Sequence, residues 1–218
     1  MHKFHIIGTD TSSGKTHTTV QLMQYLIRSQ HKVAALKPIA SGMDELINED
    51  VAQLLAAASY SLTPQQINLI TFTPPIAPHI AAKMENYALD AQSINVFIEE
   101  SSLGINYLFI EGVGGVMVPL NQNETYLDLL QVSPYPIILV VGMKLGCLNH
   151  ALLTAEVLSQ RKLKLIGWIA NQIDPQMEYY PQNLAYLKQK LKAPLLAEIP
   201  YQQTIQTTES FTEVFSCN

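Results

Sequence analysis

The sequence predicts a three-layer α/β fold in which a mostly parallel sheet is flanked by helices. Three observations support this prediction: short apolar segments alternate with helical patterns, a glycine-rich loop joins the first strand to the first helix, and polar residues follow several predicted strands. Of the 218 residues, 48% are hydrophobic and only 14% are charged. A chain of this composition can fill one large core, so we expect a single domain over residues 1–218.

A phosphate-binding loop joins the first strand, predicted over residues 2–7, to the first helix, predicted over residues 16–27. Residues 8–16 (GTDTSSGKT) place five residues between the two glycines, one more than the usual pattern. Backbone N–H groups at the helix start can bind phosphate, Lys15 adds a positive charge, and Thr16 offers a hydroxyl to Mg²⁺. We therefore predict a P-loop NTPase-like domain that binds nucleotide. The alternative is a glycine-rich turn that binds nothing.

Further strands and helices follow in alternation. Strands are predicted over residues 33–36, 107–110, 137–141, 165–170 and 195–199, and the clearest helices over residues 149–158 and 183–191. Four prolines between residues 59 and 87 disfavour a continuous helix there, and we expect an excursion of the chain near the active face.

Polar residues occur where predicted strands end, which is where parallel α/β sheets bind ligands. Residues 37–42 are expected to end the second strand, with Lys37 pointing toward the phosphate loop. A lysine that reaches solvent is the alternative, because most lysines are exposed. Glu111 follows the strand at 107–110 and precedes glycine-rich backbone, so it is well placed to hold Mg²⁺.

Two more residues have a functional and a structural interpretation. Asp50, at the start of a predicted helix, is a second Mg²⁺ candidate, or an ordinary first-turn acid stabilised by the helix dipole. Asn171 follows a strand and can read adenine, because an amide donates and accepts hydrogen bonds together. A turn-forming asparagine is the alternative for Asn171.

Composition excludes several classes of protein. The net charge is −5 and there is no basic run, which argues against a nucleic-acid partner. No apolar stretch reaches membrane-spanning length and no targeting segment is evident. Cys147 and Cys217 form no zinc or disulfide pattern, and Cys147 is expected to pack as a small apolar side chain. We expect a cytoplasmic protein that acts on small molecules.

Several segments together resemble the dethiobiotin synthetase family over nearly the whole chain. The segments are the loop at residues 8–16, residues 37–42 (KPIASG), 78–80 (PHI), 111–115 (EGVGG), 141–151 (VGMKLGCLNHA) and 167–171 (GWIAN). The resemblance implies a homodimer that converts 7,8-diaminononanoate, CO₂ and ATP into dethiobiotin, ADP and phosphate, with Mg²⁺ as cofactor. One departure is the Ser12–Ser13 pair, where many members carry an acidic or bulkier residue and then a valine, so Ser12 is left out of the predicted site.

Site roles follow from the same resemblance. The implied catalytic residues are Lys37, Lys15 and Thr11. The implied substrate-binding residues are Ser41 and, contributed by the other subunit, Gly146, Cys147, Leu148 and Asn149. The implied ATP-binding residues are Asp10, Ser13, Gly14, Lys15, Thr16, Asp50, Glu111 and Asn171, with Thr16, Asp50 and Glu111 around Mg²⁺.

Two other functions remain open for a chain with this loop. One is a partitioning-type nucleotide-switch ATPase that acts on a protein partner, although such proteins often carry an extra lysine where this chain has Asp10. The other is a small-molecule kinase, whose product would keep the phosphate. The tail after Thr204 receives no functional interpretation from the sequence.

Overall fold

The computed structural model describes residues 1–43, 47–101 and 104–215, and Cys217 lies outside them. The described strands are β1 (His2–Gly8), β2 (Val33–Leu36), β3 (Ile39–Ser41), β4 (Ile70–Phe72), β5 (Tyr107–Glu111), β6 (Ile137–Met143), β7 (Leu165–Gln172), β8 (Leu195–Ile199) and β9 (Gln206–Thr207). The described helices are α1 (Lys15–Arg28), α2 (Glu49–Ala57), α3 (Pro64–Ile67), α4 (Pro78–Met84), α5 (Ala91–Glu100), α6 (Tyr126–Val132), α7 (Cys147–Gln160), α8 (Tyr180–Lys190) and α9 (Glu209–Phe215).

The prediction of a mostly parallel sheet is confirmed. Seven strands form one sheet in the order β2-β5-β1-β6-β7-β8-β9, and among these strands only β9 runs antiparallel to its neighbour. The register aligns Ile6 with Glu111 across β1 and β5, and Leu36 with Ile110 across β2 and β5. The carboxyl ends of these strands therefore meet at one edge of the sheet, which is where the phosphate loop begins.

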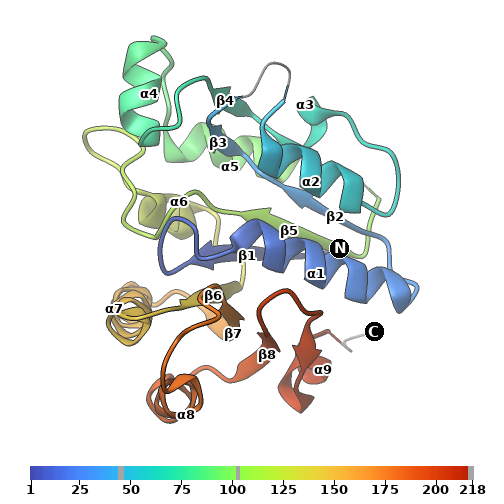
Figure 1. The fold of residues 1–218 in the computed structure, drawn as a ribbon. Helices are drawn as coiled ribbons and strands as arrows, with labels where there is room; N and C mark the ends of the chain where they lie inside the picture. The colour runs from blue at the N-terminus through green and yellow to red at the C-terminus, as the bar shows by residue number, and fades with distance from the viewer. Residues whose placement is uncertain (44–46, 102–103, 216–218) are drawn as a thin grey trace.

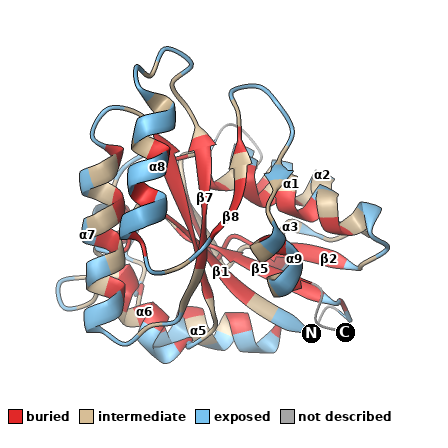
Figure 2. Ribbon diagram, turned by 90° about the horizontal axis from the view of Figure 1, so that it is seen from below, coloured by how far each residue is buried: buried red, intermediate tan, exposed pale blue. Residues whose placement is uncertain are grey.

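Helices cover both faces of this sheet (Figure 1). Figure 2 shows α1, α2 and α9 on one side of the buried strands and α5, α6, α7 and α8 on the other. Every residue of β5 and β6 is buried. Strands that are covered on both faces are expected to be apolar throughout rather than alternating, and this explains the continuous apolar runs in the sequence.

The second strand is confirmed over residues 33–36, but the sequence did not predict the separate short strand that follows it. The strand β2 stops at Leu36, and Ile39–Ser41 forms β3, which pairs with β4 in a separate two-stranded sheet. Pro38 explains the break, because proline has no N–H to donate to the ladder with β5. The backbone N–H of Lys37 instead donates to the carbonyl of Ile67 at 2.7 Å. The expected excursion is confirmed as broken structure, consisting of α3, β4 and α4.

The segment after Thr204 packs against the strands β1 and β5 and the helix α1. Its helix α9 places Phe215 5.5 Å from Phe4 and Phe211 4.9 Å from Tyr25, measured between ring centroids. The hydroxyl of Tyr107 donates to the carbonyl of Phe215 at 2.7 Å. Among the described helices, none is both long and apolar enough to span a membrane.

Candidate functional site

Strand β7 contacts the phosphate loop through the side chain of Asn171. Asn171 is buried, and its side-chain amide donates to the carbonyl of Ser13 at 3.0 Å. Gly14 has a φ of 80°, and a Cβ at this position would lie 1.9 Å from the Asn171 amide nitrogen. Only glycine fits this left-handed position beside the amide. The loop conformation therefore depends on Asn171 as well as on its own glycines.

The longer loop exposes two hydroxyl side chains at its tip. Thr11 and Ser12 are exposed and line a cavity, and Ser12 has a φ of 58°. The backbone N–H of Thr11 donates to Oδ1 of Asp10 at 2.8 Å. On the other side of this carboxylate, Nζ of Lys144 lies 3.5 Å from Oδ2 of Asp10. The structure thus adds Lys144, which follows β6, to the residues that position the loop.

Lys15 is buried at the start of α1 and its ammonium contacts backbone oxygens. Its Nζ donates to the carbonyl of Gly114 at 3.0 Å and to that of Asp10 at 3.2 Å. Burial, followed by the nearby charge of Lys37, lowers the pKa of Lys15 to about 8. No ion pair to Lys15 is present among the described residues. A phosphate would therefore be the first full negative charge placed directly against this ammonium.

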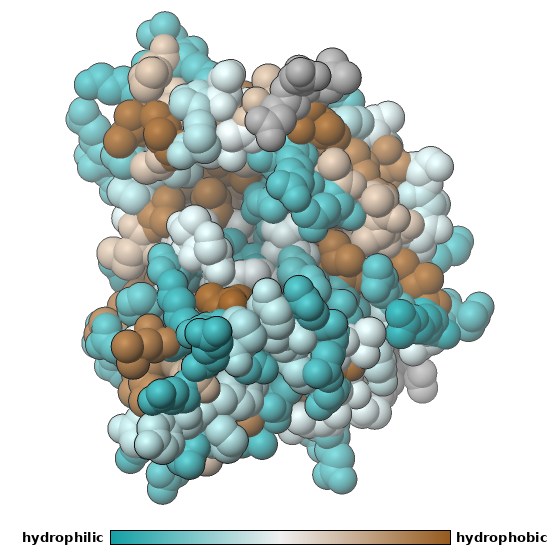
Figure 3. All heavy atoms as spheres, viewed as in Figure 1, coloured by the Kyte–Doolittle hydropathy of each residue, from teal (hydrophilic) through white to brown (hydrophobic). Residues whose placement is uncertain are grey.

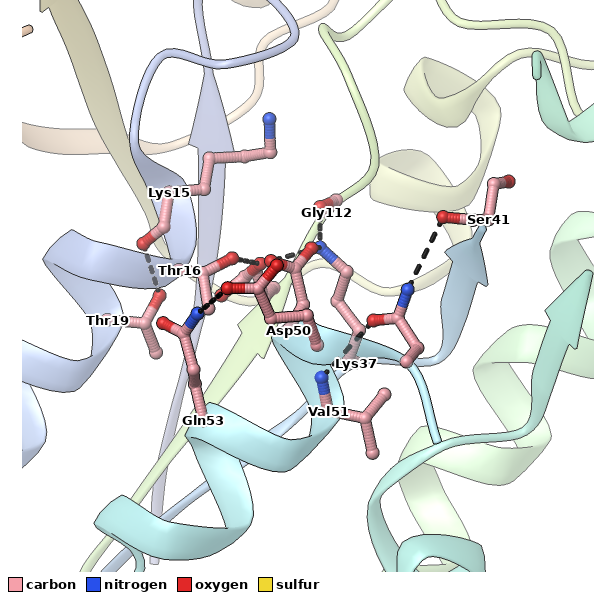
Figure 4. A network of polar contacts seen from close by, with 12 residues as sticks. Lys15, Thr16, Thr19, Lys37, Ser41, Asp50, Val51, Gln53 and Gly112 are labelled. Carbon is pink, nitrogen blue, oxygen red and sulfur yellow. Dashed lines mark hydrogen bonds and ion pairs between the residues drawn. The ribbon is translucent and has the colours of Figure 1, made fainter. Parts of the chain in front are cut away.

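Lys37 lies between two carboxylates at the edge of the sheet (Figure 4). Its Nζ is 2.6 Å from Oε1 of Glu111 and 2.9 Å from Oδ2 of Asp50, and the Thr16 hydroxyl also donates to Oε1 of Glu111 at 2.6 Å. Lys37 is only 3% exposed, so the alternative of a lysine in solvent is wrong. Burial by itself would lower the pKa of Lys37, but Glu111 and Asp50 together raise it.

Asp50 is a first-turn acid, as one of its two interpretations states, and its role as a Mg²⁺ ligand stays a prediction. It lies in the first turn of α2, where the helix dipole favours an acid, and it also pairs with Lys37. Burial alone would raise the pKa of Asp50, but the Lys37 charge outweighs it and lowers that pKa. Lys37 and Asp50 are therefore both charged at neutral pH.

The residues around Lys37 fit a Mg²⁺ ion. Oε2 of Glu111 is buried and has no hydrogen-bond partner among the described residues. The Thr16 hydroxyl contacts Oε1 of Glu111 directly. The Asp50 carboxylate lies on the other side of Lys37, which contacts both acids. Mg²⁺ prefers one or two carboxylates completed by phosphate oxygens and water. In the described parts of the chain no group of three or more His, Cys, Asp or Glu could hold a metal, so phosphate oxygens would have to complete this site.

A cavity of about 670 Å³ opens beside this cluster. Its polar side is lined by Thr11, Lys15, Lys37, Ser41 and Asp50, all of which were predicted from the sequence. The cavity also has apolar lining residues, which were not predicted and include Pro75, Ile76, Val118 and Pro119. Pro75 and Ile76 belong to the proline-rich segment between residues 59 and 87, and the prolines of that segment were the signal in the sequence for this part of the lining. The arrangement can hold an anion next to an aliphatic chain.

Other predicted site residues lie away from this cavity. Gly146, Cys147, Leu148 and Asn149 form the start of α7, and none of them lines the cavity. Cys147 is 1% exposed, which confirms that it packs in the core, and burial raises the pKa of its thiol. Next to it Leu145 is 94% exposed. Within one chain, the α7 start and the phosphate loop are separate surfaces.

Fold and site together define a P-loop nucleotide-binding protein of the three-layer α/β class. Solved structures show the same fold. The septum site-determining protein MinD from Pyrococcus horikoshii aligns with a TM-score of 0.57 at 18% identity, covering 91% of this chain and 81% of that one. The cell division protein FtsY from Thermotoga maritima aligns with a TM-score of 0.58 at 13% identity, covering 100% of this chain and 69% of that one.

Sequence comparison identifies the family within this class. A family model described as an AAA domain matches residues 2–209. The ATP-dependent dethiobiotin synthetase BioD of Pseudoalteromonas translucida is 40% identical over the full length of both chains. That of Legionella pneumophila strain Corby is 44% identical over 92% of this chain and 94% of its own. The chain belongs to the ATP-dependent dethiobiotin synthetase family, whose members are ligases of biotin biosynthesis, and the predicted resemblance is confirmed.

Proposed function

We propose that this chain joins CO₂ to 7,8-diaminononanoate and closes the ring to dethiobiotin, with ATP converted to ADP and phosphate. The observation that carries this proposal is the buried Lys37, held between Glu111 and Asp50 beside the phosphate loop and facing a cavity with an apolar wall. A diamine with an aliphatic chain needs such a surface next to the ATP phosphates. The family of the chain supports the same reaction.

The first step requires a neutral amine. An alkyl amine has a pKa of about 10.4, so a cation beside it must lower that value. Lys15 is suited to this role, because its ammonium contacts two backbone carbonyls and forms no ion pair among the described residues. The charge of Lys37 is offset by two carboxylates, so we assign Lys37 a directed hydrogen bond to the carbamate.

The second step transfers phosphate. The carbamate oxygen attacks the γ-phosphorus as the bond to ADP breaks, and the second amine then attacks the carbamoyl carbon and expels phosphate. Thr16, Asp50 and Glu111 would hold Mg²⁺, which neutralises phosphate charge in such transfers. Thr11 and Ser41, on the polar side of the cavity, are assigned to the diamine and its carbamate. Asn171 is assigned to the adenine base in addition to its bond with Ser13.

A homodimer would complete the site. Gly146 precedes the 14-residue helix α7, and Cys147 to Asn149 begin it; the N-terminus of this helix suits the carboxylate at the end of the substrate. Because these residues do not line the cavity of their own chain, we infer that they serve the cavity of a second copy. We further propose that residues 1–218 act as one domain in the cytoplasm.

A product assay tests this function. The chain is incubated with 7,8-diaminononanoate, bicarbonate and MgATP, and each component is omitted in turn. Mass spectrometry should detect a cyclic urea without phosphate only in the complete mixture. A phosphorylated product would indicate a kinase, and ADP release without any change in the diamine would indicate a nucleotide switch.

A further inference from the structure

A second cavity lies on the outer face of α7, away from the phosphate loop. Its volume is about 560 Å³, and it shares no lining residue with the cavity around Lys37. It is bounded by α7, the beginning of β7 and the segment that follows α8. Along α7 it extends from Asn149 to Ser159, which corresponds to about 15 Å of helix. We call this cavity the α7 groove.

The walls of the α7 groove are apolar. Leu152, Leu153, Leu163 and Leu165 line it, and Leu191 lies behind them at 6% exposure. Leu153 is 58% exposed, although removing a leucine side chain from water is energetically favourable. Figure 3 shows apolar side chains gathered around α7 at the left of the view. An elongated apolar hollow of this size is suited to an aliphatic chain.

Three lysines gather at one end of the α7 groove. Lys164 precedes β7, and Lys190 and Lys192 lie at and just after the end of α8. The parallel pairing of Trp168 with Leu195 shows that the segments leading into β7 and β8 run side by side, which brings Lys164 near Lys192. These lysines therefore mark the end of the groove that is farthest from Asn149.

The charge of these lysines is not balanced by nearby acids. Among the residues that the structure describes, Glu156 is the only acid that lines the α7 groove. None of the three lysines takes part in an ion pair among the residues that the structure describes. The dipole at the C-terminus of α8 accounts for Lys190, which also lies 5.6 Å above the Tyr186 ring. It does not account for Lys164 and Lys192, which lie outside that helix.

We propose that the α7 groove binds a medium-chain aliphatic monocarboxylate. The carboxylate lies among Lys164, Lys190 and Lys192, and the aliphatic chain runs along α7 toward Asn149. The apolar walls match the chain, and the cationic end matches its single negative charge. This inference rests on the groove and its lysines alone and does not depend on the proposed reaction.

Binding of octanoate to the full-length chain tests the proposal, with octanol as the uncharged probe of equal length. Calorimetry should show saturable binding of one octanoate per chain, with octanol roughly ten-fold weaker, because it lacks the charge-assisted contact. Replacing both Lys164→Gln and Lys192→Gln should weaken octanoate binding roughly ten-fold and leave octanol binding unchanged. The matched control is Lys188→Gln, an exposed lysine of the same helix end that does not line the groove and should not alter octanoate binding.

Three results would overturn the proposal. The first is the absence of saturable octanoate binding to the unaltered chain. The second is octanoate binding that MgADP or 7,8-diaminononanoate displaces and the lysine variants leave unchanged, because the acid would then occupy the phosphate-loop cavity. The third is a Leu153→Glu variant that is folded but no longer sediments as the assembly formed by the unaltered chain, because the groove would then be a contact between copies. Thermal unfolding of each variant verifies that it is folded.

Discussion

The Nζ of Lys37 lies 2.6 Å from Oε1 of Glu111, and both side chains are buried. The same carboxylate oxygen accepts the Thr16 hydroxyl, whereas Oε2 has no partner among the described residues. Glu111 thus connects the phosphate loop, through Thr16, to the lysine that faces the cavity. A change at either residue should affect both the chemistry and the fold.

Replacing Lys37→Gln should leave ATP binding largely intact and slow product formation on the order of 10²-fold or more. The buried Glu111 would lose its cation, which costs roughly 3–5 kcal/mol of unfolding free energy. Adding Glu111→Gln should restore much of that stability but not the turnover, because the donor to the carbamate is still missing. Product assays and denaturant unfolding measure the two effects separately. Unchanged turnover in Lys37→Gln would remove this residue from the mechanism.

Nucleotide binding should take up protons above about pH 8. The pKa of Lys15 in the free protein is about 8, below its ordinary value of 10.5, so the folded chain loses this proton before the unfolded chain does. Phosphates favour the charged lysine, so affinity should fall as the pH rises through this range. Calorimetry in buffers of different ionisation enthalpy measures the uptake. Lys15→Arg keeps the charge without titrating and should bind with no uptake; uptake equal to that of the unaltered chain would exclude Lys15 as its source.

Replacing Glu111→Gln should raise the Mg²⁺ concentration needed for half-maximal activity about 10- to 100-fold. The variant removes the negative charge and the unpartnered Oε2 while keeping the volume of the side chain. Titration of activity with Mg²⁺ at saturating ATP measures the shift. Glu178→Gln, an exposed acid, is the matched control and should leave the Mg²⁺ curve unchanged. The same Mg²⁺ curve for both variants would contradict the metal assignment.

Replacing Gly114→Ala should damage activity more than Gly104→Ala does. Both glycines have positive φ, 58° and 60°, so each substitution costs about 1–2 kcal/mol in backbone strain. At Gly114 the new Cβ would also lie 2.5 Å from Val118, and the backbone would have to shift the carbonyl that holds Lys15. At Gly104 the new Cβ would have no described atom within 4 Å apart from its chain neighbours. Thermal unfolding and nucleotide affinity compare the two; equal effects on affinity would show that the Gly114 carbonyl does not position Lys15.

Replacing Asn171→Ala should weaken ATP binding more than GTP binding. Loss of the hydrogen bond to the Ser13 carbonyl loosens the loop for both nucleotides, by about 1 kcal/mol. Loss of base recognition adds to this only for adenine. Affinities for ATP and GTP, measured in parallel, distinguish the two contributions. An equal loss for both would leave Asn171 as a brace of the loop without a role in reading the base.

Much of the fold was predictable because its signals are local. The phosphate loop, the strand before it and the helix after it occupy one continuous segment of sequence, and the apolar runs of β2, β5, β6, β7 and β8 each report a strand that is covered on both faces. The strand β3 was missed because its three residues follow Lys37 and Pro38 directly, and only pairing with β4 makes them a strand.

The loop, the parallel sheet, the family and the charged residues were all predictable from local patterns in the sequence. How those charges meet depends on packing between distant segments. Lys37 and Glu111 are 74 residues apart, and their ion pair exists because β2 and β5 align in parallel register. The apolar wall at Pro75 and Val118 likewise depends on where the excursion folds over the sheet. Contacts between distant segments follow from packing, which no local pattern of residues specifies.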